Sequence, residues 1–210
     1  MSFVHHYDHI QFYDANDYVL GIIINAIKQQ KDVNISLDPL GSVFVMASKG
    51  VYVSWVQENE KFFTTPVGSF NVKTLKTSAS GDSGSRKNRR PLDELVWQAA
   101  FYASNGCLLK GGCEPIDVVE LKRWPNLTRL PHSENAMSIA ALLSQYPTSL
   151  VLVSRMLDVE IEEVCSFYSA ARASGIAQAI NRPAVSEEDM SRPHHHRGLL
   201  AKLFAKASNL

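Results

Sequence analysis

The stretch VSRMLDVEIEEVCSFYSAARASG, residues 153–175, has the pattern of two helices that meet across a tight turn. Val153 and Leu157 would lie on the inner face of the first helix. Val164 and Phe167 recur at helical spacing on the second helix. Apolar residues of both helices can therefore pack across the turn, and this packing is the strongest fold signal in the chain.

The turn itself has residues that suit a close approach of two helices. Ser154 is small and stands where the helices would come nearest, Asp158 occupies the position that often carries glycine, and Val159 follows the turn. More elements are predicted on both sides: a helix at 91–106, a strand at 115–124, and helices at 133–145 (from a Ser133 cap), 148–157 (from a Thr148 or Ser149 cap) and 160–175. The segment IAQAI, 176–180, is too short to assign to strand or helix.

This succession within residues 91–181 resembles the winged-helix superfamily of helix-turn-helix proteins. The resemblance covers less than half of the chain. It implies a compact, mostly helical domain in which the second helix of the pair can enter the major groove of DNA. The wing that would follow this helix is short or missing, because only IAQAI precedes the polar segment that begins with NRP.

The charge at the start of the second helix argues against a DNA-reading role. Its first turn carries Glu160, Glu162 and Glu163, whereas phosphate contacts normally come from Lys and Arg. Acidic residues at a helix N-terminus instead complement the helix dipole, by about 0.3 to 1 kcal/mol each. We therefore predict a winged-helix-like fold that serves protein contacts, and keep DNA binding through residues 149–174 as the alternative.

The N-terminal part has the pattern of a helix followed by an antiparallel meander. DANDYVLGIIINAIKQQ, 14–30, has apolar residues at helical spacing behind polar capping candidates. Short runs rich in Val, Phe, Tyr and Thr follow, separated by turn residues, and predict strands at 33–37, 42–48, 50–56 and 61–67. The opening residues 3–13 could add an edge strand.

The predicted fold class is α+β, with two modules, linkers and a tail. Residues 1–76 form the helix-plus-sheet domain, 77–90 a flexible basic linker, and 91–181 the winged-helix-like domain. Residues 77–91 lose nearly all apolar side chains, which is typical of a linker or mobile loop. Residues 182–196 are predicted to be a disordered linker, and residues 197–210 to be a short amphipathic helix.

The C-terminal helix is a candidate docking element. Leu199, Leu200, Leu203 and Phe204 fall on one face, flanked by Arg197, Lys202 and Lys206. Because so short a helix is marginal in water, it is expected to fold against a groove of a protein partner or an anionic membrane surface. The alternative is that it packs back on its own domain.

Two basic clusters are candidate nucleic-acid contacts. SRKNRR contains Arg86, Lys87, Arg89 and Arg90, and LKRW places Lys122 and Arg123 beside Trp124. The alternative interpretation is a solvated linker, so nucleic acid is a disfavoured but open partner class.

The sequence predicts no catalytic residue, cofactor or metal. His5, His6 and His9 with Asp8, and His194–His196, lack the pattern of a fixed ligand set. Cys107 and Cys113 are too far apart for a CxxC pair, and no matching second pair exists for a zinc site, so the three cysteines are assigned to packing. None of the common phosphate-binding, dinucleotide-binding, hydrolase or metalloprotease motifs occurs.

Composition and charge restrict the binding partners and the cellular location that the sequence predicts. The formal net charge is zero, so attraction to a polyanion or membrane would have to be local. We find no secretory signal pattern, and the longest apolar run, near Val19–Ile27, is too short to span a bilayer. The leading hypothesis is a cytosolic, bacterial, non-catalytic regulatory or adaptor protein. A DNA-binding regulator is second, and an enzyme of unknown type in the N-terminal domain is third.

Overall fold

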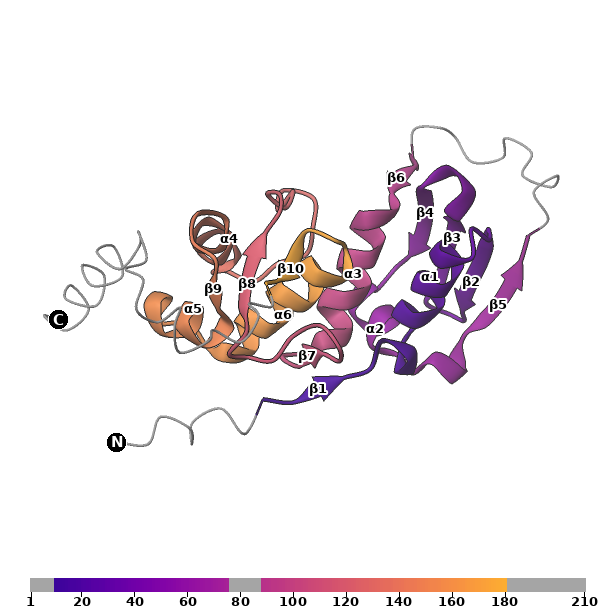
Figure 1. The fold of residues 1–210 in the computed structure, drawn as a ribbon. Helices are drawn as coiled ribbons and strands as arrows, with labels where there is room; N and C mark the ends of the chain where they lie inside the picture. Colours follow the sequence, from indigo (N-terminus) through magenta and orange to yellow (C-terminus); the bar gives the residue numbers. More distant parts are fainter. Residues whose placement is uncertain (1–9, 76–87, 181–210) are drawn as a thin grey trace, which may run out of the picture. The chain divides into compact units, whose positions relative to one another are not determined.

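A computed structural model describes residues 10–75 and 88–180 of the 210-residue chain (Figure 1). Contacts place the chain up to Ala179 in one compact unit. The described part mixes helices with antiparallel sheets, which confirms the predicted α+β class. The predicted segments 182–196 and 197–210 lie outside the described residues.

A five-stranded antiparallel sheet forms the N-terminal part. Its strand order is β5 (Asn71–Thr74), β2 (Val33–Leu37), β3 (Gly41–Met46), β4 (Val51–Val56) and β6 (Arg90–Pro91). Alternation puts Val33, Val43 and Val45 on the face that packs into the core. Helix α1 (Val19–Lys28) lies against this inner face (Figure 1). The predicted strands at 33–37, 42–48 and 50–56 are thus confirmed.

The turn from β2 to β3 requires glycine at position 41. Gly41 has a φ of +123°, and a Cβ built there would lie 2.1 Å from the Trp55 carbonyl oxygen on β4. Only a residue without a side chain fits this backbone and this approach.

The predicted strand at 61–67 is wrong, because α2 (Asn59–Thr64) occupies most of it. Phe62 and Phe63 are adjacent and both fully buried. In a strand, neighbouring side chains point to opposite faces, so a strand that borders a single core would bury only one of them. Phe62 packs against Phe70, and Phe63 stacks on Tyr102 with ring centroids 6.1 Å apart. The 3₁₀ turn η3 (Val67–Ser69) then leads into β5, which the sequence pattern did not reveal.

The start of the chain pairs elsewhere than predicted. After the 3₁₀ turn η1 (Ala15–Asp17), capped by the Asp14 side chain, the chain enters α1. The preceding strand β1 (Phe12–Tyr13) pairs in parallel with β7 (Leu108–Leu109), not with the five-stranded sheet. A further 3₁₀ turn, η2 (Ala47–Lys49), joins β3 to β4.

Helix α3 (Leu92–Ser104) joins the two predicted modules into one body. Residues Glu94 to Ala100 are all buried, because α6 (Ile161–Ala173) packs on one side of α3 and α1 and α2 pack on others. The sheet residues and the helical residues belong to one continuous hydrophobic core. The described residues of the N-terminal sheet and of the helical part therefore share one core.

The helical part contains the predicted pair of helices. Its order is β8 (Val118–Leu121), α4 (Ala136–Gln145), β9 (Thr148–Ser149), α5 (Leu150–Leu157), α6 and β10 (Ala177–Ala179). The turn between α5 and α6 has Asp158 at a φ of +53°, the conformation that glycine favours. The Ser154 hydroxyl donates to the Val159 carbonyl at 2.6 Å, a bond that closes the turn.

The segment IAQAI forms a strand. β10 pairs antiparallel with β8, which also pairs with β9, giving the strand order β10-β8-β9. The central strand of this small sheet thus precedes the helices. The predicted Ser133 cap is also wrong, because α4 begins after Asn135.

Candidate interaction surfaces

The five-stranded sheet has an outer face that also carries apolar side chains. Phe44 pairs with Val53 across β3 and β4, and Met46 pairs with Val51. Because alternate residues point to opposite faces, these side chains and Trp55 share one side. On this face Met46 and Val53 are buried, Phe44 and Val51 are half-buried, and only Trp55 is exposed. Trp55 is the most open of them, at 55% exposure.

The surroundings of these apolar residues are polar and contain no carboxylate on the strands. In register with Phe44 and Val53, β2 supplies Asn34 and β5 supplies Lys73. None of the five strands of this sheet contains Asp or Glu. An apolar patch with a polar rim is typical of a protein-binding surface. The signal in the sequence was the alternation in GVYVSWV, which places Trp55 on the face opposite Tyr52.

Basic side chains converge at the first turn of α3. Glu94, which is buried, accepts from Arg90 Nε at 2.7 Å and pairs with Arg129 at 3.4 Å. Arg90 also donates to the Arg129 carbonyl oxygen at 3.1 Å, and its guanidinium carbon lies 5.8 Å from the centre of the Tyr52 ring. One buried carboxylate thus holds two guanidinium groups from distant parts of the sequence.

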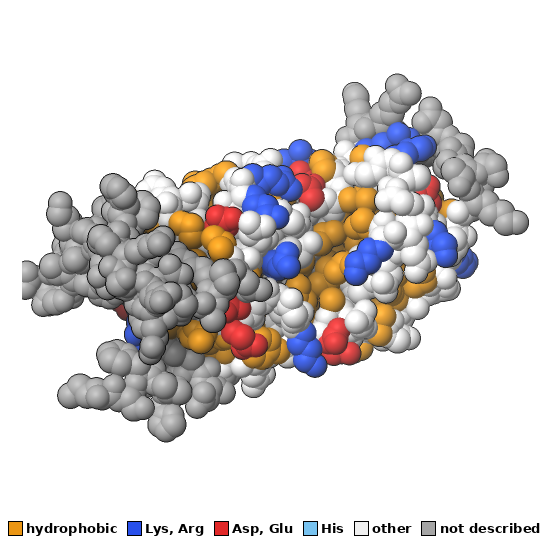
Figure 2. Space-filling view, viewed as in Figure 1, with side chains coloured by type: hydrophobic (Ala, Val, Ile, Leu, Met, Phe, Trp, Pro, Cys, Tyr) orange, Lys and Arg blue, Asp and Glu red, His pale blue; other side chains and the backbone are white. Residues whose placement is uncertain are grey.

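The loop that follows β8, residues 122–131, is fixed over the same turn of α3. Arg123 pairs with Asp93 at 2.7 Å, and Trp97 Nε1 donates to the Pro131 carbonyl at 2.9 Å. Figure 2 shows Lys and Arg side chains with acidic ones among them along this edge, over the loop and over β6. We call Arg90, Lys122, Arg123, Trp124 and Arg129 the basic surface.

The structure brings together part of the predicted nucleic-acid set. Arg90 and Arg123, from separate clusters in the sequence, pair with the adjacent residues Glu94 and Asp93. Lys122 is exposed beside Arg123, and Arg89 directly precedes β6. Arg86 and Lys87 lie outside the described residues. Sequence reasoning missed Arg129, because nothing in LTRLP indicates that this loop returns to α3.

Helix α6 lies inside the unit. Of its 13 residues only Glu162 is exposed, and eight are buried. Even polar residues on α6 serve packing: the Ser166 hydroxyl accepts from the Gly106 backbone at 3.0 Å, and the Ser169 hydroxyl accepts from the Leu109 backbone at 3.0 Å.

The glutamates at the start of α6 have structural partners. The Glu163 carboxylate accepts from the Asn135 backbone N–H and from Asn135 Nδ2, both at 2.9 Å, so it caps α4 from a neighbouring helix. Burial acts to raise the pKa of Glu163, but the nearby Ser133 hydroxyl and the two hydrogen bonds from Asn135 outweigh it, so the pKa is lowered. The side chain of Glu162 lies against Gly106.

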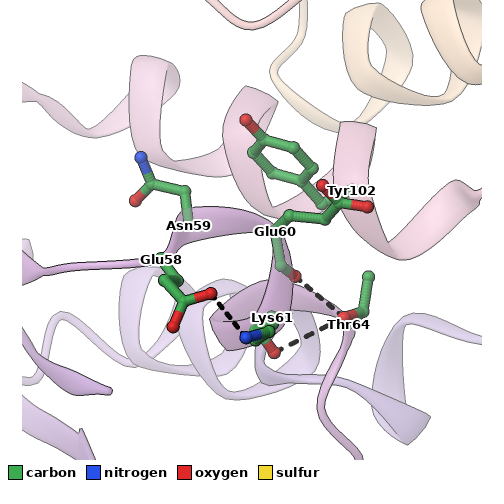
Figure 3. Close-up of a pocket in the computed structure, with 6 residues that line it drawn as sticks. All are labelled: Glu58, Asn59, Glu60, Lys61, Thr64 and Tyr102. Atoms are coloured by element: carbon green, nitrogen blue, oxygen red, sulfur yellow. Dashed lines mark hydrogen bonds and ion pairs between the residues drawn. The ribbon is translucent and has the colours of Figure 1, made fainter.

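A pocket of about 500 Å³ lies beside α2 (Figure 3). Glu58 and Lys61 form an ion pair at 2.6 Å on one side of α2, whereas the Tyr102 ring lies on the other side. The Thr64 hydroxyl donates to the Glu60 carbonyl at 2.8 Å. The lining contains no His, Cys or Ser, and two of its three charged groups, Glu58 and Lys61, pair with each other.

The three cysteine thiols are partly or fully buried. Cys165 is fully buried on α6, and Cys107 and Cys113 are half-buried. Burial raises the pKa of all three thiols, to about 11 for Cys113 and to about 12 for Cys165. Within residues 10–75 and 88–180, no group of three or more His, Cys, Asp or Glu side chains could hold a metal ion.

The remaining predicted sites lie outside the described residues. They are the partner-binding residues within 197–210. The histidines at 5, 6, 9 and 194–196, to which no metal site is assigned, also lie outside the described residues. In the part of the chain that the structure describes, every helix is too short or too polar to cross a bilayer.

Comparison with known proteins gives no relative from which to transfer a function. No protein-family model, curated protein or solved structure matches this chain.

Proposed function

We propose that this protein is a non-catalytic adaptor or regulator that binds a protein partner through the outer face of its five-stranded sheet. The observation that carries the proposal is Trp55, which is 55% exposed on the outer face beside the half-buried Phe44 and Val51. Tryptophan is among the residue types that contribute most binding energy in protein interfaces.

The charge of this face favours a partner with acidic residues. Lys73 stands in register with Asn34 and Phe44 on strands that have no carboxylate. The complementary surface would present apolar side chains with acidic residues at its rim.

The same geometry favours protein binding over the DNA-reading alternative. A recognition helix must present one face to the groove, whereas α6 exposes only Glu162. Its neighbour Glu163 is engaged by Asn135. An enzyme in the N-terminal part is also less well supported, because the pocket beside α2 lacks a convergent set of reactive groups.

The test is site-specific photo-cross-linking in cells of the source organism, followed by binding measurements. A photoreactive residue at position 55 should capture a protein, and the same residue at the exposed position Lys110 should not. The purified partner should then bind Trp55→Ser at least about 10-fold more weakly than the wild type, as expected for an interface hot spot.

Val72→Ser is the matched control. Val72 is apolar and 42% exposed on the same sheet, but its register with Ile35 places it on the opposite face. The proposal is wrong if no protein is captured from position 55, or if Trp55→Ser binds the partner as tightly as Val72→Ser does.

A further inference from the structure

The basic surface has an excess of positive charge that its own ion pairs do not neutralise. Four cations, Arg90, Lys122, Arg123 and Arg129, stand against the carboxylates of Asp93 and Glu94. Glu120 on β8, which accepts from Gln178 Nε2 at 2.7 Å, adds a third carboxylate, so the cations exceed the carboxylates by one. The local field is therefore positive although the whole chain is neutral.

An exposed aromatic ring stands within this charge. Trp124 is 49% exposed and directly follows Lys122 and Arg123, which are also exposed. The other apolar residues of the loop point inward: Pro125, Leu127 and Leu130 are buried. A single ring among cations suits stacking on a planar group, and it offers little apolar surface for insertion into a membrane.

The surface is held in place before any ligand binds. The Arg123–Asp93 and Arg129–Glu94 pairs and the hydrogen bond from Trp97 to Pro131 fasten the loop to α3. A fixed platform loses less conformational entropy on binding than a loop that must be ordered first.

We propose that the basic surface binds single-stranded nucleic acid, with Lys122 and Arg123 contacting phosphates and Trp124 stacking on an unpaired base. Stacked aromatic rings beside cations are the general means of binding single strands, and a duplex offers no free base face to such a ring. This site lies outside the helix-turn-helix pair, and it goes beyond the protein-binding role of the sheet.

Fluorescence anisotropy with labelled dT20, rU20 and a 20-base-pair duplex tests the proposal across a salt series. The full chain should bind one or both single strands more tightly than the duplex, and the affinity should fall as salt rises. Trp124→Ala should weaken binding by about 5- to 100-fold, the range for loss of one stacked base. Lys122→Ala/Arg123→Ala should weaken binding and flatten the salt dependence.

Lys49→Ala/Lys110→Ala is the matched control, because it removes the same charge from exposed positions elsewhere. It should stay within about twofold of the wild type, since screening at physiological salt limits the effect of distant charges. Thermal melting confirms that each variant is folded. In a Trp55→Phe background, the oligonucleotide should quench tryptophan fluorescence, and Trp124→Phe should abolish this quenching.

Four results would overturn the proposal. They are no binding of either single strand at low salt, equal or tighter binding of the duplex, full retention of affinity in Trp124→Ala, and binding of phosphatidylserine vesicles without binding of the oligonucleotides. The sheet-face variant Trp55→Ser should keep nucleic-acid binding, so failure of this proposal and failure of the protein-binding proposal are distinguishable.

Discussion

The Glu163 carboxylate should contribute to stability by capping α4 from the first turn of α6. Glu163→Ala removes the acceptor for the Asn135 backbone N–H and for Asn135 Nδ2. Hydrogen bonds to a charged group are worth about 1.5 to 3 kcal/mol, and partial exposure reduces this value, so we expect a loss of about 2 kcal/mol. For a unit of this size, that lowers the melting temperature by roughly 4 to 8 °C.

The pH dependence distinguishes this cap from a simple packing effect. Because the pKa of Glu163 is lowered in the folded state, its stabilisation is fully present above its ordinary pKa of 4.5. This stabilisation is lost as the pH falls from 4.5 through the lower pKa that Glu163 has in the folded protein. Glu163→Gln cannot ionise and should lose about 1 kcal/mol at pH 7. The difference in free energy of unfolding between Glu163→Gln and the wild type should therefore decrease below pH 4.5.

Glu160→Ala is the control for charge at the same helix end. Glu160 is exposed, and its side chain makes no capping hydrogen bond. Its removal should change the free energy of unfolding by no more than about 0.5 kcal/mol. Urea and thermal unfolding at pH 7 and pH 3.5 measure both effects. The reasoning fails if Glu163→Ala is as mild as Glu160→Ala, or if the gap for Glu163→Gln is the same at both pH values.

Two further predictions concern the backbone and the thiols. Gly41→Ala should cost about 3 kcal/mol or more in urea unfolding, because its Cβ would collide with the Trp55 carbonyl oxygen, whereas Gly68→Ala, with open space around it, should be nearly neutral. An equal effect of the two substitutions would contradict this account. Cys113 and Cys165, with pKa values raised to about 11 and about 12, should resist iodoacetamide at pH 8 and react only after denaturation. Rapid alkylation of the native protein would show that these thiols are not shielded.

Local patterns were sufficient to predict the elements that follow a simple periodicity. The α5–α6 pair, α3, α1 and the three strands β2 to β4 all have regular spacing of apolar residues, and the structure has each of them. The geometry of the turn was also predictable, because Ser154 and Asp158 are suited by size and by backbone preference to a tight helix junction.

The errors occurred where tertiary contacts decide the structure. KFFTTPV is rich in residues that favour strands, but Phe62 and Phe63 both find core partners only when the segment is helical. β5 is short and fully exposed, so it has no apolar alternation to reveal it. The Ser133 cap was plausible by residue type, but Asn135 is the residue that precedes α4, and the Glu163 carboxylate accepts its backbone and side-chain N–H groups.

The candidate surfaces were predictable to different degrees. The clusters around Arg90 and Arg123 are visible as composition, whereas their convergence on Glu94 and Asp93, together with Arg129, depends on the path of the loop after β8. Trp55 could be placed on the outer face by alternation alone. Whether that face is left outside the core depends on which side α1 packs, and a local pattern does not determine this.

The buried position of α6 determines which surfaces of the protein are available for binding. In a DNA reader the second helix of the pair must stand out from the body, but here it packs against α3 and binds the backbone of the α3–β7 turn through Ser166 and Ser169. Glu163 at the start of α6 has a structural role in this arrangement, because it caps a neighbouring helix instead of facing phosphates.

Binding must therefore use other surfaces, and Trp55 and Trp124 mark two that differ in chemistry. The sheet face is apolar with a polar rim, and the basic surface is cationic around one ring. Because the two tryptophans lie on separate elements, Trp55→Ser and Trp124→Ala should each weaken one binding activity and preserve the other. Loss of both activities in either variant would mean that the two surfaces serve a single partner.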